Sequence, residues 1–534
     1  MIKKIIIKYR FQFFLSIVMA IGLWLRFYNL PDQVWSQSGY DESRDMLVAE
    51  HIYKYKESIN RGPLAAGGLG QLKNSPVYYY LIAMLWALAS NPTSFMYLWA
   101  TILAGQILLA YLIGKKLGDE TSGIITSIVF AINNQLIYQS RQLLQPHLLP
   151  VFSLLFLWIL LKNKEKKSII FILLMIFLLL FPLHIHYGVL IIFPAGCFWI
   201  SYFWSEILEE KISIKNIFLP IITAVGLIFS WIIATYRKKV FDQILFFTTN
   251  FTKSNISFLE KINQLLTELT NSFIPSFSLF WAILFIIFFT ILSFFWLKKK
   301  YSRSGIINWA IICSFSFSTL LAVLFSGRIA NTYLLSSLPF FLILLSLGLR
   351  QLISINKLFG LIIVGWILYF LYIPTNHLLF FNTPAESFRQ QNYKIAKLIY
   401  RDSIKNNQDK KQPINFGIAS LSTIENLPFD GWATSGIWFY LEKLFDQKLI
   451  KLTSIGVSHS PLIRKINDLY FICDHRVLSE RINESCLNRF TKNRNYLVDY
   501  PKKIYQSQNY TVWKTKINPK KNPGSYYKVY RDLL

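Results

Sequence analysis

Charged residues are scarce in this chain of 534 residues. Asp, Glu, Lys and Arg make up 16% of the sequence, against about 25% in an ordinary globular protein. Hydrophobic residues make up 53% and aromatic residues 17%. A soluble fold of this composition would have too little polar side chain to cover its surface. The composition therefore excludes a set of soluble domains and predicts a polytopic membrane protein.

Cysteine is also rare, and its spacing does not suggest metal binding. The four cysteines are Cys197, Cys313, Cys473 and Cys486, and no two of them have CxxC spacing. We therefore expect neither a metal cluster nor a disulfide framework.

Acidic residues are half as numerous as basic ones. The chain has 28 Asp and Glu against 56 Lys and Arg, for a formal net charge of +28. Such an excess occurs in nucleic-acid-binding proteins, but beside long apolar runs it is typical of the basic cytoplasmic loops of membrane proteins. We expect no nucleic acid partner.

Apolar segments recur along the first two thirds of the chain, and a helix needs about 20 such residues to cross a bilayer. The candidate spans are 11–30, 95–114, 121–138, 147–161, 168–182, 187–204, 217–235, 273–297, 305–326, 330–350 and 357–374. The first follows a basic stretch and has no small-residue cleavage site, so we expect a retained anchor with a cytoplasmic N-terminus. The expected fold is a polytopic α-helical membrane protein of about 11–13 transmembrane helices.

Short basic loops predict the orientation of these spans. Residues 115–116, 162–167, 298–303 and 350–357 are expected to be cytoplasmic. The loops at 31–75, 139–146, 183–186, 236–272 and 327–329 then lie outside. Residues 76–90 are apolar enough to enter the membrane, but a full crossing there would reverse every later loop. We expect a short or half-inserted helix, or one paired with a further helix.

The character of the chain changes after Pro374. Residues 375–534 contain no long apolar run, and we expect strands at 413–419 and 468–473 and a helix at 393–404. The sequence thus predicts a transmembrane domain at 1–374, with its first external loop at 31–75. A small α/β domain at 375–534 should lie outside the cytoplasm.

The first external loop gathers carboxylates in a chain that is otherwise poor in them. Asp41 and Glu42 lie just beyond the first span, and Lys73 and Tyr78 follow further along. A carboxylate at the membrane surface can accept a proton from a nucleophile or hold a cation, although acids in external loops are more often simply solvated. Asp41 and Glu42 are the candidate catalytic residues, and Lys73 and Tyr78 are candidate substrate contacts.

Three further external loops carry polar candidates for substrate binding: Arg141, Gln145 and His147, then His184 and His186, then Arg328 and Tyr333. Arginine suits phosphate because its planar fork binds two oxygens, although anchoring to lipid headgroups is the commoner role of a lone arginine. Two histidines at this spacing can bind a metal, but interfacial hydrogen bonding is commoner without further ligands nearby. All these groups share one external face with the acids, which suits a lipid-linked phosphate substrate.

This ordered pattern resembles the GT-C superfamily of glycosyltransferases, and within it the bacterial protein-mannosyltransferase and aminoarabinose-transferase branch. The resemblance spans residues 10–350 and rests on Arg26-Phe27-Tyr28-Asn29-Leu30, Tyr40-Asp41-Glu42-Ser43, Asn74-Ser75-Pro76-Val77-Tyr78-Tyr79-Tyr80, Gly114-Lys115-Lys116-Leu117-Gly118, Ser140-Arg141, His186-Tyr187 and the segment 328–339.

The resemblance implies an inverting transfer of a sugar from a polyprenyl-phosphate donor to a protein, lipid or polysaccharide acceptor outside the cytoplasmic membrane. Asp41 matches the first-loop acid, which acts in these enzymes as a base or orients the acceptor. Two positions depart from the pattern: Gln145 stands where relatives often have a second acid, and the lysine expected beside a prolyl pair is displaced to Lys73. No cofactor is firmly implied. A divalent cation stays open, because some branches use one and others do not.

Two other functions compete with a glycosyltransferase. A transporter or flippase of lipid-linked saccharides would usually show internal repeats and charges near the bilayer midplane, and the sequence shows neither. A non-catalytic scaffold, whose basic external domain binds polymers, is the third hypothesis.

Overall fold

The computed structural model of the chain describes most of the helical part and the central strands of the C-terminal part. The described residues are 2–30, 40–56, 58–59, 62, 75–89, 91–210, 213–236, 257–273, 279–320, 334–376, 388–406, 414–421, 437, 440–441, 450–455, 468–474, 487, 498–507, 510–516 and 526–527. They form two compact units: Met1–Leu30, Asn60–Tyr78 and Ser94–Thr383 in the first, and Pro31–Ile59, Tyr79–Thr93 and Pro384–Leu534 in the second.

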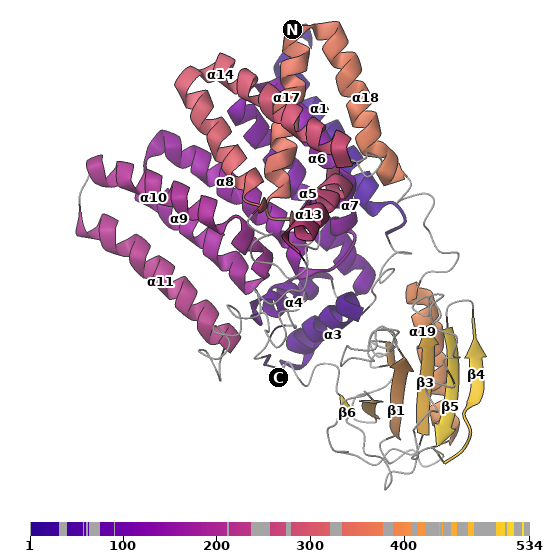
Figure 1. Ribbon diagram of the computed structural model, residues 1–534. Coiled ribbons are helices and arrows are strands. Elements are labelled where there is room, and N and C mark those ends of the chain that lie inside the picture. The colour runs from indigo at the N-terminus through magenta and orange to yellow at the C-terminus, as the bar shows by residue number, and fades with distance from the viewer. Residues whose placement is uncertain are drawn as a thin grey trace. The chain divides into compact units, whose positions relative to one another are not determined.

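The first unit is a bundle of helices (Figure 1). They are α1 (Ile2–Phe27), α5 (Pro92–Leu117), α6 (Glu120–Ile132), α7 (Asn134–Ser140), η1 (Gln145–Leu148), α8 (Leu149–Lys166), α9 (Ile169–Leu180), η2 (Phe181–His184), η3 (Tyr187–Ile191), α10 (Phe193–Glu210), α11 (Ile214–Tyr236), α13 (Phe258–Phe273), α14 (Leu279–Phe317), α17 (Leu338–Ile355) and α18 (Lys357–Asn376).

Several of these helices match the dimensions of a bilayer. Within the described residues, five segments are long and apolar enough to cross a membrane: Tyr9–Phe27, Pro92–Leu117, Gln145–Lys166, Asn216–Ala234 and Leu338–Ile355. Shorter apolar helices lie at Val77–Ala89, Glu120–Ile132, Ile169–His184 and Lys357–Tyr369. The fold is therefore a polytopic helical membrane protein, as the composition predicted.

Apolar side chains fill the interior of the bundle and also cover its outside. Phe315 of α14 stacks on Phe340 of α17 with ring centroids 4.7 Å apart, and both rings are fully buried. By contrast α11, which packs mainly against α9, leaves Phe218, Ile222 and Phe229 more than half exposed. An exposed apolar surface of this kind is expected where a helix faces lipid.

One predicted span is interrupted in the structure, and two others form a bent pair of helices. The span expected at 121–138 is divided at Asn133, whose backbone N–H closes α6 on Val129 while its side chain accepts the N–H of Leu136 to begin α7. One asparagine thus ends one helix and caps the next. The spans expected at 273–297 and 305–326 correspond to α14, where Ser302 takes the left-handed φ of 51° and the chain bends between two helical segments. Residues 321–326 lie outside the described chain.

The four basic loops that we predicted to share one face are joined by side chains. Arg350, near the end of α17, forms an ion pair with Asp119 in the turn between α5 and α6, at 2.9 Å. Lys116 pairs with Glu165 at the end of α8.

The third basic loop is tied in the same way. Lys164 Nζ donates to the side-chain oxygen of Asn308 at 2.7 Å and to the Ser304 backbone carbonyl at 3.0 Å. The Tyr301 hydroxyl donates to the Gly118 carbonyl oxygen at 2.6 Å. All four basic loops therefore meet at one end of the bundle.

The second unit contains two helices from the N-terminal third of the chain. They are α3 (Tyr40–Tyr55) and α4 (Val77–Ala89), although the first two residues of α4 belong to the first unit. The Tyr80 hydroxyl bonds both the N–H and the carbonyl of Ile59, at 3.0 and 3.1 Å. With 13 residues, α4 has the short length predicted for this segment.

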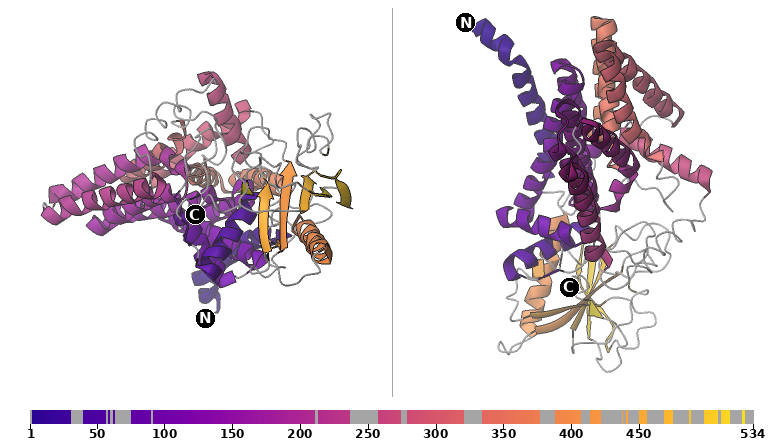
Figure 2. Two further views of the ribbon diagram at one scale, coloured as in Figure 1. Left: turned by 90° about the horizontal axis from the view of Figure 1, so that it is seen from below. Right: turned by 90° about the vertical axis from the view of Figure 1, so that its left-hand side faces the viewer.

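The rest of the second unit is a six-stranded sheet with the order β4-β5-β3-β1-β2-β6. Its strands are β1 (Ile414–Leu421), β2 (Ile450–Ile455), β3 (Asp468–Asp474), β4 (Lys502–Gln506), β5 (Tyr510–Lys516) and β6 (Tyr526–Tyr527). The central β1 runs parallel to β2 and β3, with Ile418 opposite Ser454 and Tyr470. Helix α19 (Phe388–Asn406) lies along one face of the sheet (Figure 2). The predicted helix and both predicted strands are confirmed.

Partly buried polar contacts hold α19 to the sheet. The Tyr470 hydroxyl and the Lys514 ammonium each donate to Asp402 at 2.6 Å. Burial, together with the bond to Asp402, raises the pKa of Tyr470. Cys473 of β3 is disulfide-bonded, whereas Cys197 and Cys313 are free thiols. No spacing pattern indicated this bond, and the sequence analysis, which expected no disulfide framework, did not predict it.

Candidate active site

The structure describes some of the predicted site residues and not others. Lys73, Arg328 and Tyr333 lie outside the described residues. Asp41 occupies a helical position in the first turn of α3, and its side chain also lies outside the described part. The predicted convergence of Asp41 with Arg328 therefore stays a prediction.

Helix α3 places its other acids in a buried position. Glu42 and Asp45 are three residues apart, which sets them on one face of the helix, and both are buried together with His51. Sequence analysis treated this segment as a loop in which acids are usually solvated, and it selected neither Asp45 nor His51 as a site residue. The helical spacing of Glu42 and Asp45 was the available signal. Because both the Glu42 and the Asp45 carboxylates are buried, α3 is a candidate for acid or base chemistry.

The second polar loop is built around the end of α1. Arg26, the last basic residue of α1, is fully buried and donates to the carbonyls of Gly22, Phe130 and Ala131 at 2.9, 3.2 and 3.1 Å. Phe130 and Ala131 are in the last turn of α6, where helix carbonyls lack partners and the helix dipole favours a cation. Arg26 therefore fixes α1 to α6.

Gly22 lies where α1 approaches α5 and α6. A Cβ at this position would lie 2.3 Å from Cδ1 of Ile107 and 3.3 Å from Cβ of Ala131. A larger residue there would require the Ile107 side chain to move and α1 to shift slightly from Ala131.

Arg141 follows α7 directly and rests on this anchor. Its guanidinium donates to the Leu25 carbonyl oxygen at 3.2 Å, and the side chain is buried. Burial lowers the pKa of Arg141 to about 10, so the group keeps its charge at neutral pH. A buried cation of fixed shape at the end of a bundle is the kind of group that binds phosphate oxygens.

His147 helps to shape the same loop. Both the Trp99 indole N–H and the His147 Nδ1 approach the Gln142 carbonyl oxygen, at 2.9 and 3.0 Å. A carbonyl only accepts, so the proton of His147 is assigned to Nδ1, and Nε2 is an acceptor in the neutral ring. Gln145, which begins η1, is also buried.

His186 has the opposite tautomer. Its Nδ1 accepts the backbone N–H of Gly188 at 3.0 Å and caps η3, so the neutral ring carries its proton on Nε2. Burial, reinforced by the nearby ring of His147, lowers the pKa of His186 to about 4. At neutral pH, His186 is therefore a neutral hydrogen-bond donor. The ring of His147 lies close enough to that of His186 to lower its pKa, and Arg141 precedes His147 in the same loop.

The structure also describes the surroundings of two further predicted substrate contacts, Tyr78 and His184. Tyr78 is fully buried in the first turn of α4. His184 lies between two serines, with Nδ1 3.1 Å from the Ser75 hydroxyl and Nε2 3.2 Å from that of Ser230. This geometry favours hydrogen bonding over metal ligation at His184. Among the residues that the structure describes, no three His, Cys, Asp or Glu gather as metal ligands.

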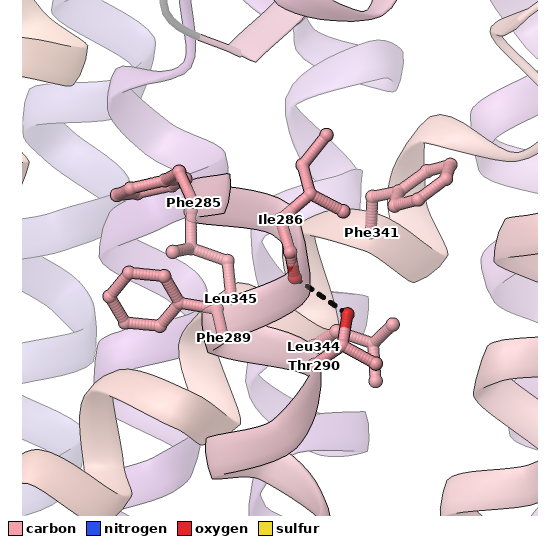
Figure 3. Close-up of a pocket in the computed structure, with 7 residues that line it drawn as sticks. All are labelled: Phe285, Ile286, Phe289, Thr290, Phe341, Leu344 and Leu345. Carbon is pink, nitrogen blue, oxygen red and sulfur yellow. Dashed lines mark hydrogen bonds between the residues drawn. The ribbon is translucent and has the colours of Figure 1, made fainter. Parts of the chain in front are cut away.

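A separate small pocket lies between α14 and α17 (Figure 3). It is lined by Phe285, Ile286, Phe289, Thr290, Phe341, Leu344 and Leu345. Its one hydroxyl, on Thr290, donates to the Ile286 carbonyl at 2.7 Å within the same helix. With no charge and no polar group left to face a ligand, this pocket is a packing gap and not the candidate site.

Comparison with known proteins finds solved structures of similar fold but no match in sequence. No protein-family model matches the chain, and no curated protein matches it in sequence. Among solved structures, the chain has a TM-score of 0.53 with ArnT from Cupriavidus metallidurans in the apo state, at 9% identity over 89% of this chain and 93% of that one. For ArnT bound to undecaprenyl phosphate the TM-score is 0.50, at 10% identity over 94% and 97%.

A second neighbour is archaeal. The oligosaccharyltransferase AglB from Archaeoglobus fulgidus, in complex with an inhibitory peptide and a dolichol-phosphate, gives a TM-score of 0.51 at 12% identity over 88% of this chain and 70% of that one. The chain spans 63% of the length of the same oligosaccharyltransferase tethered with an acceptor peptide. Both neighbours are GT-C glycosyltransferases, and the chain has a GT-C-like fold with a small C-terminal sheet.

Proposed function

We propose that this chain is an integral membrane glycosyltransferase. It moves a sugar from a polyprenyl-phosphate donor to an acceptor at the outer face of the cytoplasmic membrane, with inversion at the sugar carbon. The observation that carries the proposal is a GT-C-like fold over nearly the whole chain, shared with a structure that holds undecaprenyl phosphate. The buried Arg141, with the neighbouring rings of His147 and His186, supports it, because these side chains supply a cation and neutral hydrogen-bonding groups.

The chemistry asks for two kinds of group. The leaving polyprenyl phosphate develops negative charge, which fixed donors stabilise in the transition state. Arg141 and the Nε2–H of His186 take this role, with Lys73, Arg328 and Tyr333 as further predicted donors. The acceptor must lose a proton as it attacks the sugar carbon, and Asp41 takes that proton as base, with Glu42 beside it. Tyr78, Gln145 and His147 complete the predicted substrate contacts.

Charge supports the orientation that we propose. Helix α8 has 18 residues, or about 27 Å at 1.5 Å per residue, with His147 and Leu149 at one end and the joined basic loops at the other. By the positive-inside rule the basic end is cytoplasmic. Arg141, His147 and His186 then face outward, and the N-terminus is cytoplasmic. The disulfide of Cys473 supports an extracytoplasmic place for the domain at 375–534, since such bonds persist in oxidising compartments.

Transfer by the purified protein tests this function. The protein in lipid nanodiscs is given a polyprenyl-phosphate donor with a labelled sugar, and release of the label from the lipid is followed. We expect Asp41→Asn to abolish transfer in a protein that still folds and inserts. Glu50→Gln, a carboxylate change in the same helix, is the matched control and should transfer normally.

Two outcomes would count against the proposal. Normal transfer by Asp41→Asn would remove Asp41 from the mechanism. Movement of the intact labelled donor across the bilayer, with no release of sugar, would instead support a transporter or flippase of lipid-linked saccharides. Comparison of envelope glycans and lipids by mass spectrometry, with and without the protein, then identifies the acceptor.

A further inference from the structure

His184 joins two parts of the chain that are far apart in sequence. It ends η2, and its ring lies between Ser75 and Ser230, which are 109 and 46 positions away. Ser75 stands just before Pro76 and α4, where the first external loop of 31–75 ends. Ser230 is on α11. Ser75 and His184 are both buried, so this contact is protected from competing water.

The hydrogen bonds around His184 have one consistent direction. The Ser230 hydroxyl donates to the Leu227 carbonyl at 2.8 Å, which leaves its oxygen to accept from His184 Nε2. The His184 ring also bonds the Leu227 backbone carbonyl, which only accepts, and this favours a proton on Nε2. His184 Nδ1 then carries no proton and accepts from the Ser75 hydroxyl. The Ser75 oxygen in turn accepts the backbone N–H of Val77 at 3.3 Å, as the cap of α4. This series of hydrogen bonds runs from the Val77 N–H to the Leu227 carbonyl, and it requires a neutral His184 ring with its proton on Nε2.

We propose that His184 is a positioning residue that fastens the end of the first external loop to α11, and not the substrate contact that the sequence predicted. Both of its ring nitrogens are engaged by serine hydroxyls, which leaves no polar atom to meet a ligand. His184 and Ser75 are buried, whereas Ser230 is exposed on α11. Because hydrogen bonds to both ring nitrogens hold the imidazole in one orientation, the ring sets where α4 begins. The functional consequence rests on the proposed glycosyltransferase, since the loop that ends at Ser75 carries Asp41 and Lys73.

The tautomer of His184 tests the geometry without any measurement of transfer. Protein labelled with ¹⁵N-histidine is compared in nanodiscs with the His184→Asn variant, so that one ring can be assigned by difference. We expect a neutral ring protonated at Nε2 at neutral pH. A ring protonated at Nδ1, or a charged ring, would overturn the proposal while leaving the proposed function untouched.

Three substitutions of His184 then separate the contribution of its hydrogen bond to Ser75 from that of its hydrogen bond to Ser230. His184→Asn keeps an acceptor near Nδ1 for Ser75, His184→Gln keeps a donor near Nε2 for Ser230, and His184→Phe keeps neither. One net hydrogen bond changes a rate or equilibrium constant about fivefold. The His184→Asn and His184→Gln variants should therefore each have a kcat/KM about fivefold higher than that of His184→Phe. Thermal unfolding of each variant reports whether it has folded.

Ser230 distinguishes positioning from substrate binding. If His184 acts through Ser230, Ser230→Ala should lower transfer as much as His184→Asn does, and the double variant should be no worse than either. The control is Ser205→Ala on α10, whose hydroxyl donates to the Tyr202 carbonyl of its own helix at 2.7 Å, and it should transfer normally. Full transfer by Ser230→Ala beside a strong loss in His184→Asn would mean that His184 contacts substrate, and would refute the positioning role.

Discussion

The ion pair between Asp119 and Arg350 joins α6 to α17, and its removal should measurably loosen the basic end of the bundle. Asp119 caps α6 by accepting the Ser122 N–H at 2.7 Å. The Asp119 carboxylate also accepts hydrogen bonds from Arg350 Nη2 at 2.9 Å and from Arg350 Nε at 3.3 Å. The guanidinium lies 4.5 Å from the centre of the Trp296 ring. Asp119→Asn keeps the cap and removes the charge, whereas Asp119→Ala removes both.

The burial of the pair sets the size of the effect. The side chains of Arg350 and Asp119 are 18% and 28% exposed, so the pair is stronger than a surface bridge but keeps some contact with solvent. Hydrogen bonds to charged groups contribute about 1.5–3 kcal/mol and exposed pairs below about 1 kcal/mol. We expect Asp119→Asn to cost about 1–2 kcal/mol of unfolding free energy on this scale. Asp119→Ala should cost about 1 kcal/mol more, because the cap is lost as well.

Acid should reproduce part of this loss. Partial burial raises the pKa of Asp119, but the bonds from Arg350 and Ser122 outweigh it, and the pKa lies below the ordinary 3.8. A lowered carboxyl pKa stabilises the folded state fully above the unfolded value and stops doing so as the pH falls through the folded one. The stability of the wild-type protein should therefore fall faster below pH 3.8 than that of Asp119→Asn.

Unfolding in mixed detergent micelles provides the assay. A double-mutant cycle of Asp119→Asn and Arg350→Met at pH 7 gives the coupling energy between the two side chains, which we expect to be about 1–2 kcal/mol. A coupling below about 0.3 kcal/mol, within the error of additivity, would refute the reasoning. So would equal losses in the Asn and Ala variants, since the cap would then contribute nothing.

Two further predictions concern the site and the C-terminal domain. Arg141→Lys keeps a charge but loses the planar fork, so kcat/KM for transfer should fall about 10-fold or more; an unchanged value would remove Arg141 from phosphate binding. Cys473→Ser should cost the C-terminal domain about 2–4 kcal/mol, and alkylation of unfolded wild-type protein before and after reduction should show new thiols only after reduction. Prompt alkylation of Cys473 without reductant would show that the bond is absent.

Hydropathy predicted the helices well but not their interruptions. The helices are long apolar runs, and length and composition are enough to find them. Asn133, Asn134 and Gln135 interrupt one of these runs over only three residues, and the side chain of Asn133 supplies the cap of the next helix. The bend at Ser302 falls inside a basic stretch that the sequence already marked as a loop, and there the prediction of two helices in α14 was right.

The predicted site shows where sequence reasoning ends. Residue type and loop position were enough to select His147 and His186, whose rings lie near each other in the structure. Roles could not be predicted in the same way. The two serines that engage His184 lie 109 and 46 positions away, and no local pattern connects them. The role of Asp41 stays a prediction that only the transfer assay tests.

The end of α1 connects the two halves of the proposed chemistry. Arg26 bonds only carbonyl oxygens, two of them at the negative end of α6, so its charge is used in holding α1 in place. The preceding residue, Leu25, offers its carbonyl to Arg141. The first external loop starts a few residues later and leads to Asp41. The last turn of α1 therefore precedes the loop that leads to the proposed base, Asp41, and also binds the proposed phosphate-binding residue, Arg141. Any displacement of this end of α1 should disturb donor binding and proton transfer together.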